Sequence, residues 1–265
     1  MTARPVIALL SDFGLRDHYV AAMKAVVLGI CPDASLVDIT HQIPPQDILA
    51  GALELEAIAP YLPGGTVVLA VVDPGVGSGR RAVAIEAGGL HFVGPDNGLF
   101  SLALQRLSQA TAVSIEDRRF VRERVSRTFE GRDRFAPAAA WLARGAALRE
   151  LGPMVSDLVA LDVPVAATTR DGIDGVVLRV DHFGNLVTNV SDDALPALRS
   201  SITVHVAGAT IEGVSGTYAE VPPGSLCAIV GSTGRLEISC NNGNAATVLK
   251  AARGTSVHVR LRSGA

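Results

Sequence analysis

Three aspartates, Asp12, Asp73 and Asp181, each stand at the end of a short apolar run of the chain. In open α/β sheets, ligands bind beyond the carboxyl ends of the strands, so a carboxylate at that place projects into the binding crevice. A single aspartate there is better explained as a helix cap or a turn residue. Asp12 and Asp73 are each followed by a glycine within two residues, and together they favour a site.

The segment 73–81 (DPGVGSGRR) is the most distinctive part of the chain. Its glycines suggest a phosphate-binding loop, but it lacks the Lys-Ser/Thr pair of a P-loop, and a strand-like run follows it instead of a helix. We predict that this loop brings the Asp73 carboxylate and the Arg80 guanidinium together over a small ligand. Such a pair can hold a water or orient a polar substrate. The alternative is a surface turn with solvated arginines.

Two further segments combine polar and aromatic residues. In residues 128–133 (TFEGRD), Glu130 can act as an acid or a base if a cleft encloses it, and is otherwise one more surface charge. In residues 181–186 (DHFGNL), Phe183 can stack on a purine while Asn185 contacts its edge. A plain β-turn is the alternative for this second segment.

Other common site patterns are missing from the sequence. The six histidines are scattered without HxH or HExxH spacing, so we expect no metal site. There is no Gly-x-Ser-x-Gly elbow, which argues against a serine hydrolase. The three cysteines lack CxxC spacing, which argues against a disulfide framework and a zinc knuckle.

These side chains need a scaffold, and the first ~150 residues show the pattern of a parallel sheet with crossover helices. We expect buried strands at residues 6–10, 36–39, 66–72 and 82–85, and helices at residues 19–30, 46–59, 97–107 and 137–143. The charged stretch 110–127 has no assigned structure.

From about Leu151 onward the pattern changes. Short strand-like runs, separated by Gly, Pro and Asn, occur at residues 176–180, 202–206, 226–230 and 257–261. This spacing predicts a small β domain, either a sandwich or a barrel. We therefore expect an α/β domain over residues 1–155, a linker over 156–172 and a β domain over 173–265.

Composition limits the protein class. Hydrophobic residues make up 48% of the chain and charged residues 18%, which is enough apolar material for a sizeable core. The net charge of −3 gives no basic surface for nucleic acid or an anionic membrane. Apolar runs such as residues 67–72 are far shorter than the ~20 residues of a membrane helix, and the N-terminal run is too short for a secretory signal. We expect a soluble, cytoplasmic protein.

Several short motifs follow one another along the chain in a fixed order. They are residues 12–14 (DFG) with Asp17, 39–41 (ITH), 73–77 (DPGVG), 94–98 (GPDNG), 183–185 (FGN) and 243–245 (GNA). As an ordered set covering nearly the whole chain, they resemble the S-adenosyl-L-methionine (SAM) hydroxide adenosyltransferase family, which is related to the SAM-dependent fluorinase and chlorinase. The resemblance implies hydrolysis of SAM to adenosine and L-methionine without a cofactor.

The resemblance also implies an architecture. It predicts a three-layer α/β N-terminal domain with a mostly parallel sheet, followed by a smaller C-terminal β-barrel domain. The predicted assembly is a homotrimer with active sites between subunits. The predicted partners are therefore SAM, its products adenosine and L-methionine, and further copies of the same chain.

In the N-terminal domain, the resemblance assigns roles to four residues. Asp12 matches the carboxylate that holds the ribose hydroxyls, and Asp17 lies in the same motif. Asp73 and Arg80 match two members of the family's water-handling Asp-Arg-His triad. These two are therefore expected to be catalytic.

In the C-terminal domain, the resemblance points to residues that face the ligand from the neighbouring subunit. Asp181, Phe183 and Asn185 match positions that line the methionine amine and the adenine. Ser232 and the region of Asn242 resemble the remaining segment that faces the ligand.

One position departs from the family. Where the hydrolases usually read Thr-Phe-His-Gly-Arg-Asp, this chain has Thr128 and Phe129, expected to line the substrate, and then Glu130 in place of the histidine. A carboxylate can accept a proton from water or pair with Arg80, but two acids near one nucleophile raise each other's pKa. We expect SAM binding to persist, with Glu130 as the third catalytic residue and hydrolysis weakened or altered in its pH dependence.

Three alternative functions follow from the same residues. A SAM-dependent halogenase is disfavoured because Asp73 would repel a desolvated halide and because the chain runs directly from residues 83–85 to 92–94 without an inserted loop. A non-catalytic SAM- or adenosine-binding protein is suggested by Glu130. A structural or interaction protein would be favoured if the fold kept Asp12 and Asp73 apart with no cleft between them.

Overall fold

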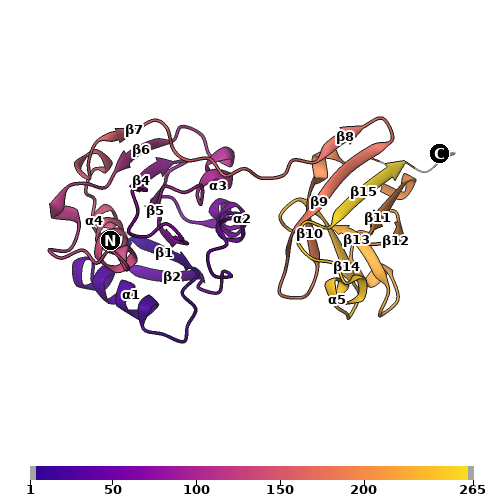
Figure 1. The fold of residues 1–265 in the computed structure, drawn as a ribbon, viewed down its shortest axis with the longest axis horizontal. Coiled ribbons are helices and arrows are strands. Elements are labelled where there is room, and N and C mark those ends of the chain that lie inside the picture. Colours follow the sequence, from indigo (N-terminus) through magenta and orange to yellow (C-terminus); the bar gives the residue numbers. More distant parts are fainter. Residues whose placement is uncertain (1–3, 198, 262–265) are drawn as a thin grey trace. The chain divides into compact units, whose positions relative to one another are not determined.

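The computed structural model describes residues 4–197 and 199–261 and divides into two compact units, Met1–Leu161 and Asp162–Ala265 (Figure 1). The boundary falls inside the segment 156–172 that the sequence predicts to be a linker. The start of that segment is attached to the first unit, because Arg81 Nη1 donates to Asp157 Oδ1 at 2.6 Å. Within the described ranges, none of the helices combines the length and apolarity that crossing a bilayer requires.

In the first unit, seven strands form one mixed sheet. The strands are β1 (Val6–Ser11), β2 (Ser35–Thr40), β3 (Val67–Val71), β4 (Ala82–Ala87), β5 (Leu90–Pro95), β6 (Thr111–Ser114) and β7 (Met154–Val155). The helices are α1 (Tyr19–Ile30), α2 (Ile48–Ile58), α3 (Ser101–Arg106) and α4 (Ala136–Ala143). In the sheet order β2-β1-β3-β5-β4-β6-β7, the first three pairings are parallel and the last three are antiparallel.

The central strand β3 is covered on both faces. Val67, Leu69 and Val71 pack in a core with α1 and α4, while Val68 and Ala70 pack in a second core with α2 and α3. Because side chains alternate along a strand, a strand between two cores appears in sequence as an uninterrupted apolar run. The expected three-layer α/β domain is confirmed, with the sheet lying between the two helix pairs (Figure 1).

Three predicted elements need correction. The helix predicted at residues 97–107 spans only Ser101–Arg106, because Gly98, with a φ of 93°, keeps the preceding residues out of helical geometry. The helix predicted from residue 46 begins at Ile48, because Gln46 has a φ of 66° and Asp47 caps the helix, its Oδ1 accepting a hydrogen bond from Ala50 N–H at 3.0 Å. The strand predicted as buried at residues 36–39 is β2, which lies at the edge of the sheet and leaves Val37 44% exposed.

The antiparallel half of the sheet starts at a hairpin that is not among the predicted elements, although Gly-Gly between two apolar runs is a pattern typical of one. Strands β4 and β5 are joined by Gly88 and Gly89, whose φ angles are 58° and 78°. Positive φ at both central residues is the requirement of the tight hairpin turn that suits twisted strands. The connection between residues 83–85 and 92–94 is therefore short, as the sequence indicates, and it reverses the strand direction.

The second unit is a nearly closed, barrel-like antiparallel sheet, in agreement with the expected barrel. Its strands are β8 (Ala167–Thr169), β9 (Gly172–Val180), β10 (Leu186–Ser191), β11 (Ile202–Val206), β12 (Ala209–Glu212), β13 (Leu226–Val230), β14 (Arg235–Cys240) and β15 (Ser256–Leu261), with one short helix, α5 (Ala245–Leu249). The order is β12-β11-β15-β9-β10-β14-β13, with β8 beside β9. A bridge from Ser215 to Ile229 of β13 brings the chain after β12 to the opposite edge strand.

Candidate active site

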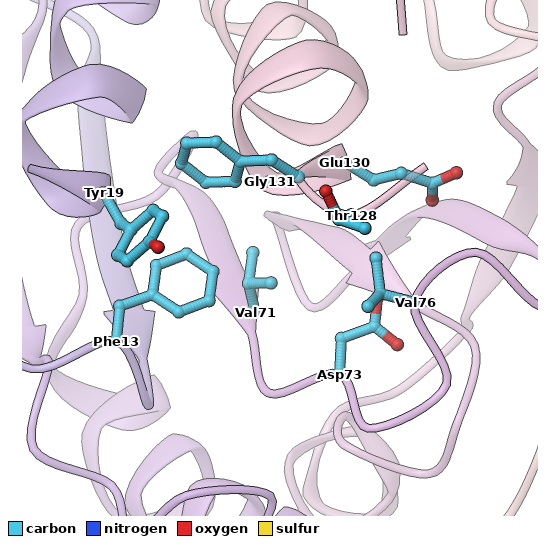
Figure 2. Close-up of a pocket in the computed structure, with 9 residues that line it drawn as sticks. Phe13, Tyr19, Val71, Asp73, Val76, Thr128, Glu130 and Gly131 are labelled. Atoms are coloured by element: carbon cyan, nitrogen blue, oxygen red, sulfur yellow. The ribbon is translucent and has the colours of Figure 1, made fainter. Parts of the chain in front are cut away.

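A pocket in the first unit lies beyond the carboxyl ends of β1 and β3. It is lined by Phe13, Tyr19, Val71, Asp73, Val76, Thr128, Phe129, Glu130 and Gly131 (Figure 2). The chain passes from β1 to β2 on one side and then returns to β3 on the other side of β1, so strand order reverses between β1 and β3. Such a reversal point is where open α/β sheets bind ligands.

Arg80 links two carboxylates at this pocket. Its Nε donates to Asp73 Oδ1 at 2.9 Å and to Oδ2 at 3.0 Å, and its Nη2 also donates to Asp73 Oδ2. The same Nη2 donates to Glu130 Oε2 at 2.6 Å. The predicted pairing of Asp73 with Arg80 is confirmed, and Glu130 completes a carboxylate–guanidinium–carboxylate chain.

The three charged side chains are well shielded from solvent. The exposed fractions of the Asp73, Arg80 and Glu130 side chains are 5%, 11% and 13%. Burial alone would lower the pKa of Arg80, but the hydrogen bonds and charges of Asp73, and then of Glu130, outweigh burial and raise that pKa above its usual value. Arg80 therefore stays cationic between two carboxylates. Arg134 Nε lies 3.6 Å from Glu130 Oε1, so two arginines balance the two carboxylates when both are ionised.

The loop that carries Arg80 is held by a close backbone contact. Gly77 has a φ of 77°, and a Cβ at that position would lie 2.6 Å from the carbonyl oxygen of Arg127. Arg127 Nη2 in turn donates to the Gly77 carbonyl at 3.2 Å. Only glycine combines that φ with that approach, and the contact places the Arg80 loop directly beside the segment that leads to Glu130.

A π-helical turn at Gly131–Phe135 orients the other side of the pocket. Such turns are rare and are frequent at functional sites. The turn is anchored by the fully buried Asp133, which accepts hydrogen bonds from Arg132 Nε at 2.7 Å and from Ser126 N–H at 2.9 Å. Burial would raise the pKa of Asp133, but these hydrogen bonds and the arginine charge lower it. Asp133 thus remains ionised and fixes the turn that follows Glu130.

Three aromatic rings lie together at the same pocket. The centroid distances are 5.8 Å for Phe13–Tyr19, 5.8 Å for Phe13–Phe129 and 5.2 Å for Tyr19–Phe129. Figure 2 shows Phe13 and Tyr19 on one side of Val71, with the carboxyl groups of Asp73 and Glu130 on the other. The pocket therefore has an aromatic side and an anionic side.

Two predicted residues of the first unit lie outside this lining. Asp12 is half-buried, and its Oδ2 accepts a hydrogen bond from Gln46 N–H at 2.8 Å. This bond joins the end of β1 to the residue before the cap of α2. Asp17 is exposed in the loop that precedes α1. Their ligand-binding roles stay predictions.

In the second unit, Phe183, Asn185 and Asn242 line a separate pocket. The other lining residues are Tyr218, Cys240, Asn241, Gly243 and Asn244. Phe183 is 72% exposed, which is unusual for a large aromatic side chain. Ser232 does not line this pocket.

Asp181 organises the loop that presents Phe183. Its Oδ1 accepts hydrogen bonds from Phe183 N–H at 2.9 Å and Asn185 N–H at 2.8 Å, and its Oδ2 accepts one from Asn185 Nδ2 at 2.8 Å. Gly184, with a φ of 86°, has no room for a Cβ because the Asn244 side chain would lie 2.1 Å away. The segment is thus a turn, and its aromatic residue is directed to solvent.

Sequence reasoning missed several residues of the two pockets. Tyr19 was assigned only as the first residue of a helix, although it follows the DFG motif by a few positions and is 40% exposed. Tyr218 lies 35 positions along the chain from Phe183, and no motif joins the two. Within residues 4–197 and 199–261, no group of three or more His, Cys, Asp or Glu side chains is arranged to hold a metal ion.

Comparisons with known proteins cover both units. Residues 7–152 match the model of the SAM hydroxide adenosyltransferase N-terminal domain, and residues 175–258 match that of the corresponding C-terminal domain. The chain is 42% identical to the (R)-S-adenosyl-L-methionine hydrolase of Salinispora tropica, over 98% of this chain and 99% of the relative. It is 43% identical to the protein of the same name from Thermus thermophilus, over 97% and 99%. An uncharacterized conserved protein from Thermotoga maritima superposes with a TM-score of 0.91 at 32% identity, over 96% of this chain and 99% of that one.

Proposed function

Since this chain belongs to the SAM hydroxide adenosyltransferase family, and its relatives from Salinispora tropica and Thermus thermophilus are named SAM hydrolases, we propose that it hydrolyses SAM to adenosine and L-methionine through a water held by Asp73, Arg80 and Glu130. The observation that carries the mechanism is the Asp73–Arg80–Glu130 chain at the wall of the pocket. The function itself rests on the family, and the residue roles rest on the family resemblance together with the contacts among the three side chains.

The reaction is a substitution at the ribose C5′ carbon. The water oxygen forms a bond to C5′ while the C5′–S bond breaks, and the electron pair of that bond goes to sulfur, leaving methionine as a neutral thioether. One proton of the water passes to a carboxylate. Because the sulfonium already supplies a good leaving group, we propose that no cofactor takes part.

Each member of the chain has a separate task. Asp73 orients the water and accepts a hydrogen bond from it, since only part of the acceptor capacity of its carboxylate is used by Arg80. Arg80 holds both carboxylates in place and stabilises negative charge that develops on the water oxygen. Glu130, in the position of the family histidine, supplies a second proton acceptor in the pocket.

The scaffold contributes by alignment and exclusion of water. Fixing a nucleophile opposite its leaving group can contribute ~7–11 kcal/mol through effective molarity. The low exposure of all three charged side chains keeps bulk water from the reacting atoms. Desolvation also strengthens the interaction of Arg80 with developing negative charge.

We further propose binding roles for the remaining residues. Asp12 and Asp17 contact the ribose side of the substrate, and Thr128 and Phe129 line its reacting part. In the second unit, Phe183 stacks on the adenine, and Asp181, Asn185, Ser232 and Asn242 contact the adenine and the amino acid. The exposed ring of Phe183 supports this role, because it needs a partner surface.

We propose that the active assembly is a homotrimer in which neighbouring copies complete one another's sites. Sedimentation equilibrium of the purified full-length protein tests the assembly. A mass of three chains supports it. A monomer that hydrolyses SAM at full rate would contradict it.

Isotope labelling tests the function. Purified protein is incubated with SAM in ¹⁸O-water with chloride present, and the products are analysed by mass spectrometry. Adenosine labelled at its 5′ oxygen, together with methionine, is the expected result. A 5′-chloro nucleoside would indicate halogenase activity, and unchanged SAM with measurable binding would indicate a binding protein.

We expect Glu130→His to raise turnover about tenfold, which corresponds to ~1.4 kcal/mol of activation free energy. The exchange removes one of two negative charges beside the nucleophile, and like charges disfavour hydroxide character in the attacking water. It should also introduce an acid limb near pH 6.5, the ordinary pKa of imidazole. Initial rates between pH 5 and 9 measure both effects.

Glu130→Gln is the matched control for this variant. It keeps the size of the side chain and a carbonyl acceptor for Arg80 but supplies no titrating group. A Glu130→His variant with unchanged turnover would show that Glu130 does not limit the rate.

A further inference from the structure

We infer that Phe13, Tyr19 and Phe129, together with the carboxylates of Asp73 and Glu130, form a cage that recognises the sulfonium charge of SAM and discriminates against neutral thioether nucleosides. This inference rests on the proposed function and deepens it. It assigns substrate selection to the aromatic side of the pocket.

The geometry suits an alkylated cation. The Tyr19 and Phe129 rings stand at 90° to each other with centroids 5.2 Å apart, and Phe13 lies 5.8 Å from both. The three rings thus pack directly against one another and form one aromatic wall of the pocket. Figure 2 shows the apolar Val71 between the rings of Phe13 and Tyr19 on one side and the carboxyl groups of Asp73 and Glu130 on the other.

The chemistry of sulfonium explains why such a pocket is needed. A trialkyl sulfonium has no N–H or O–H group, so hydrogen-bond acceptors cannot replace its hydration. Aromatic faces attract cations through the ring quadrupole, and this is how quaternary ammonium ligands are recognised. Arg80 and Arg134 balance the charges of Asp73 and Glu130, so the carboxylate oxygens attract a cation only at short range and the ring faces supply the rest of the attraction.

Of the three rings, Tyr19 is the one most available to bind a cation. Arg132 already lies 5.0 Å from the Phe129 centroid, where it is held by Asp133. Tyr19 is 40% exposed at the start of α1, although it packs against Phe13 and Phe129 and borders His18. A half-exposed tyrosine in the same pocket as the Asp73 and Glu130 carboxylates can contact an incoming cation.

The cage also favours product release. Methionine leaves as a neutral thioether, so the cation–π and charge attraction disappear as the C5′–S bond breaks. Weaker contacts between sulfur and the rings remain. S-adenosylhomocysteine resembles SAM without the methyl group and the charge, so the same cage keeps it from competing.

Binding of two non-hydrolysable nucleosides tests the cage. Titration calorimetry compares sinefungin, which carries a protonated amine in place of the sulfonium, with neutral S-adenosylhomocysteine. We expect Tyr19→Leu to weaken sinefungin binding about fivefold (~1 kcal/mol) and to change S-adenosylhomocysteine binding by less than about twofold. Tyr19→Phe keeps the ring and should retain the parent affinities.

Tyr61→Leu serves as the matched control, because Tyr61 is 75% exposed and lies outside the pocket lining. Equal weakening of both nucleosides by Tyr19→Leu would overturn the inference, since the ring would then act by packing alone. A Tyr19→Phe variant as weak as Tyr19→Leu would also overturn it, because the hydroxyl would be responsible. Failure of the parent to bind either nucleoside would instead refute the proposed function.

Discussion

Asp73→Asn is expected to lower turnover by roughly 10²–10⁴-fold, the range for removal of a positioned proton acceptor. The variant keeps the shape of the side chain but removes its charge and one of the two oxygens that face Arg80. Its amide N–H groups would also oppose the donors of the guanidinium. Single-turnover hydrolysis of SAM by excess protein measures the chemical step separately from product release.

Binding and folding controls identify the cause of this loss. Sinefungin affinity should change less than turnover, because the aromatic rings and Glu130 remain. Retention of more than a tenth of the parental rate would show that Asp73 does not handle the water. The urea unfolding midpoint checks that the variant is folded under the assay conditions.

Arg80→Met is expected to cost about 3–5 kcal/mol of unfolding free energy, in addition to turnover. The guanidinium is the shared partner of Asp73 and Glu130. Its removal leaves the shielded Asp73 without its guanidinium partner and leaves Glu130 with only the longer, 3.6 Å contact to Arg134. It also removes the contact of Arg80 with the Phe135 ring, whose centroid lies 5.2 Å away. Urea denaturation at pH 7 measures the loss.

Two comparisons make this prediction specific. Arg119→Met removes an arginine that is 66% exposed and paired with Asp117, so it should cost far less stability than Arg80→Met, because solvent screens an exposed pair. Arg80→Lys keeps the positive charge but not the planar fork, so most of the stability should return while turnover stays low. A stability loss for Arg80→Met no greater than that of Arg119→Met would contradict the proposed role of Arg80 as the bridge.

The sequence predicts best those site residues that lie close to one another in the chain. Asp73 and Arg80 lie in one glycine-rich loop, and their residue types alone indicate a carboxylate–guanidinium pair. The contact of Arg80 with Glu130 spans 50 positions, so local spacing cannot indicate it. The family resemblance named Glu130, and the geometry adds that it binds the same Nη2 as Asp73.

The helices and strands likewise divide into those that local sequence predicts and those that depend on distant partners. The helix α1 was predicted at both of its ends because its apolar spacing is regular and Pro32 follows it closely. The strand β6, only four residues long, lies in the charged stretch that had no assignment. Its pairing with β4 and β7 makes it a strand, and the sequence of β6 alone does not indicate which strands it pairs with.

The contact between Gly77 and the Arg127 carbonyl has a consequence for how this active site can change over time. The Gly77 backbone packs against the Arg127 carbonyl and accepts a hydrogen bond from the Arg127 side chain, so this contact between the two segments does not involve the side chain at position 130. The side chain at position 130 can therefore be a carboxylate, an amide or an imidazole while this contact continues to hold the two segments together. Single substitutions at position 130 could thus change the rate of SAM hydrolysis during evolution, while the surrounding loops keep the specificity for SAM.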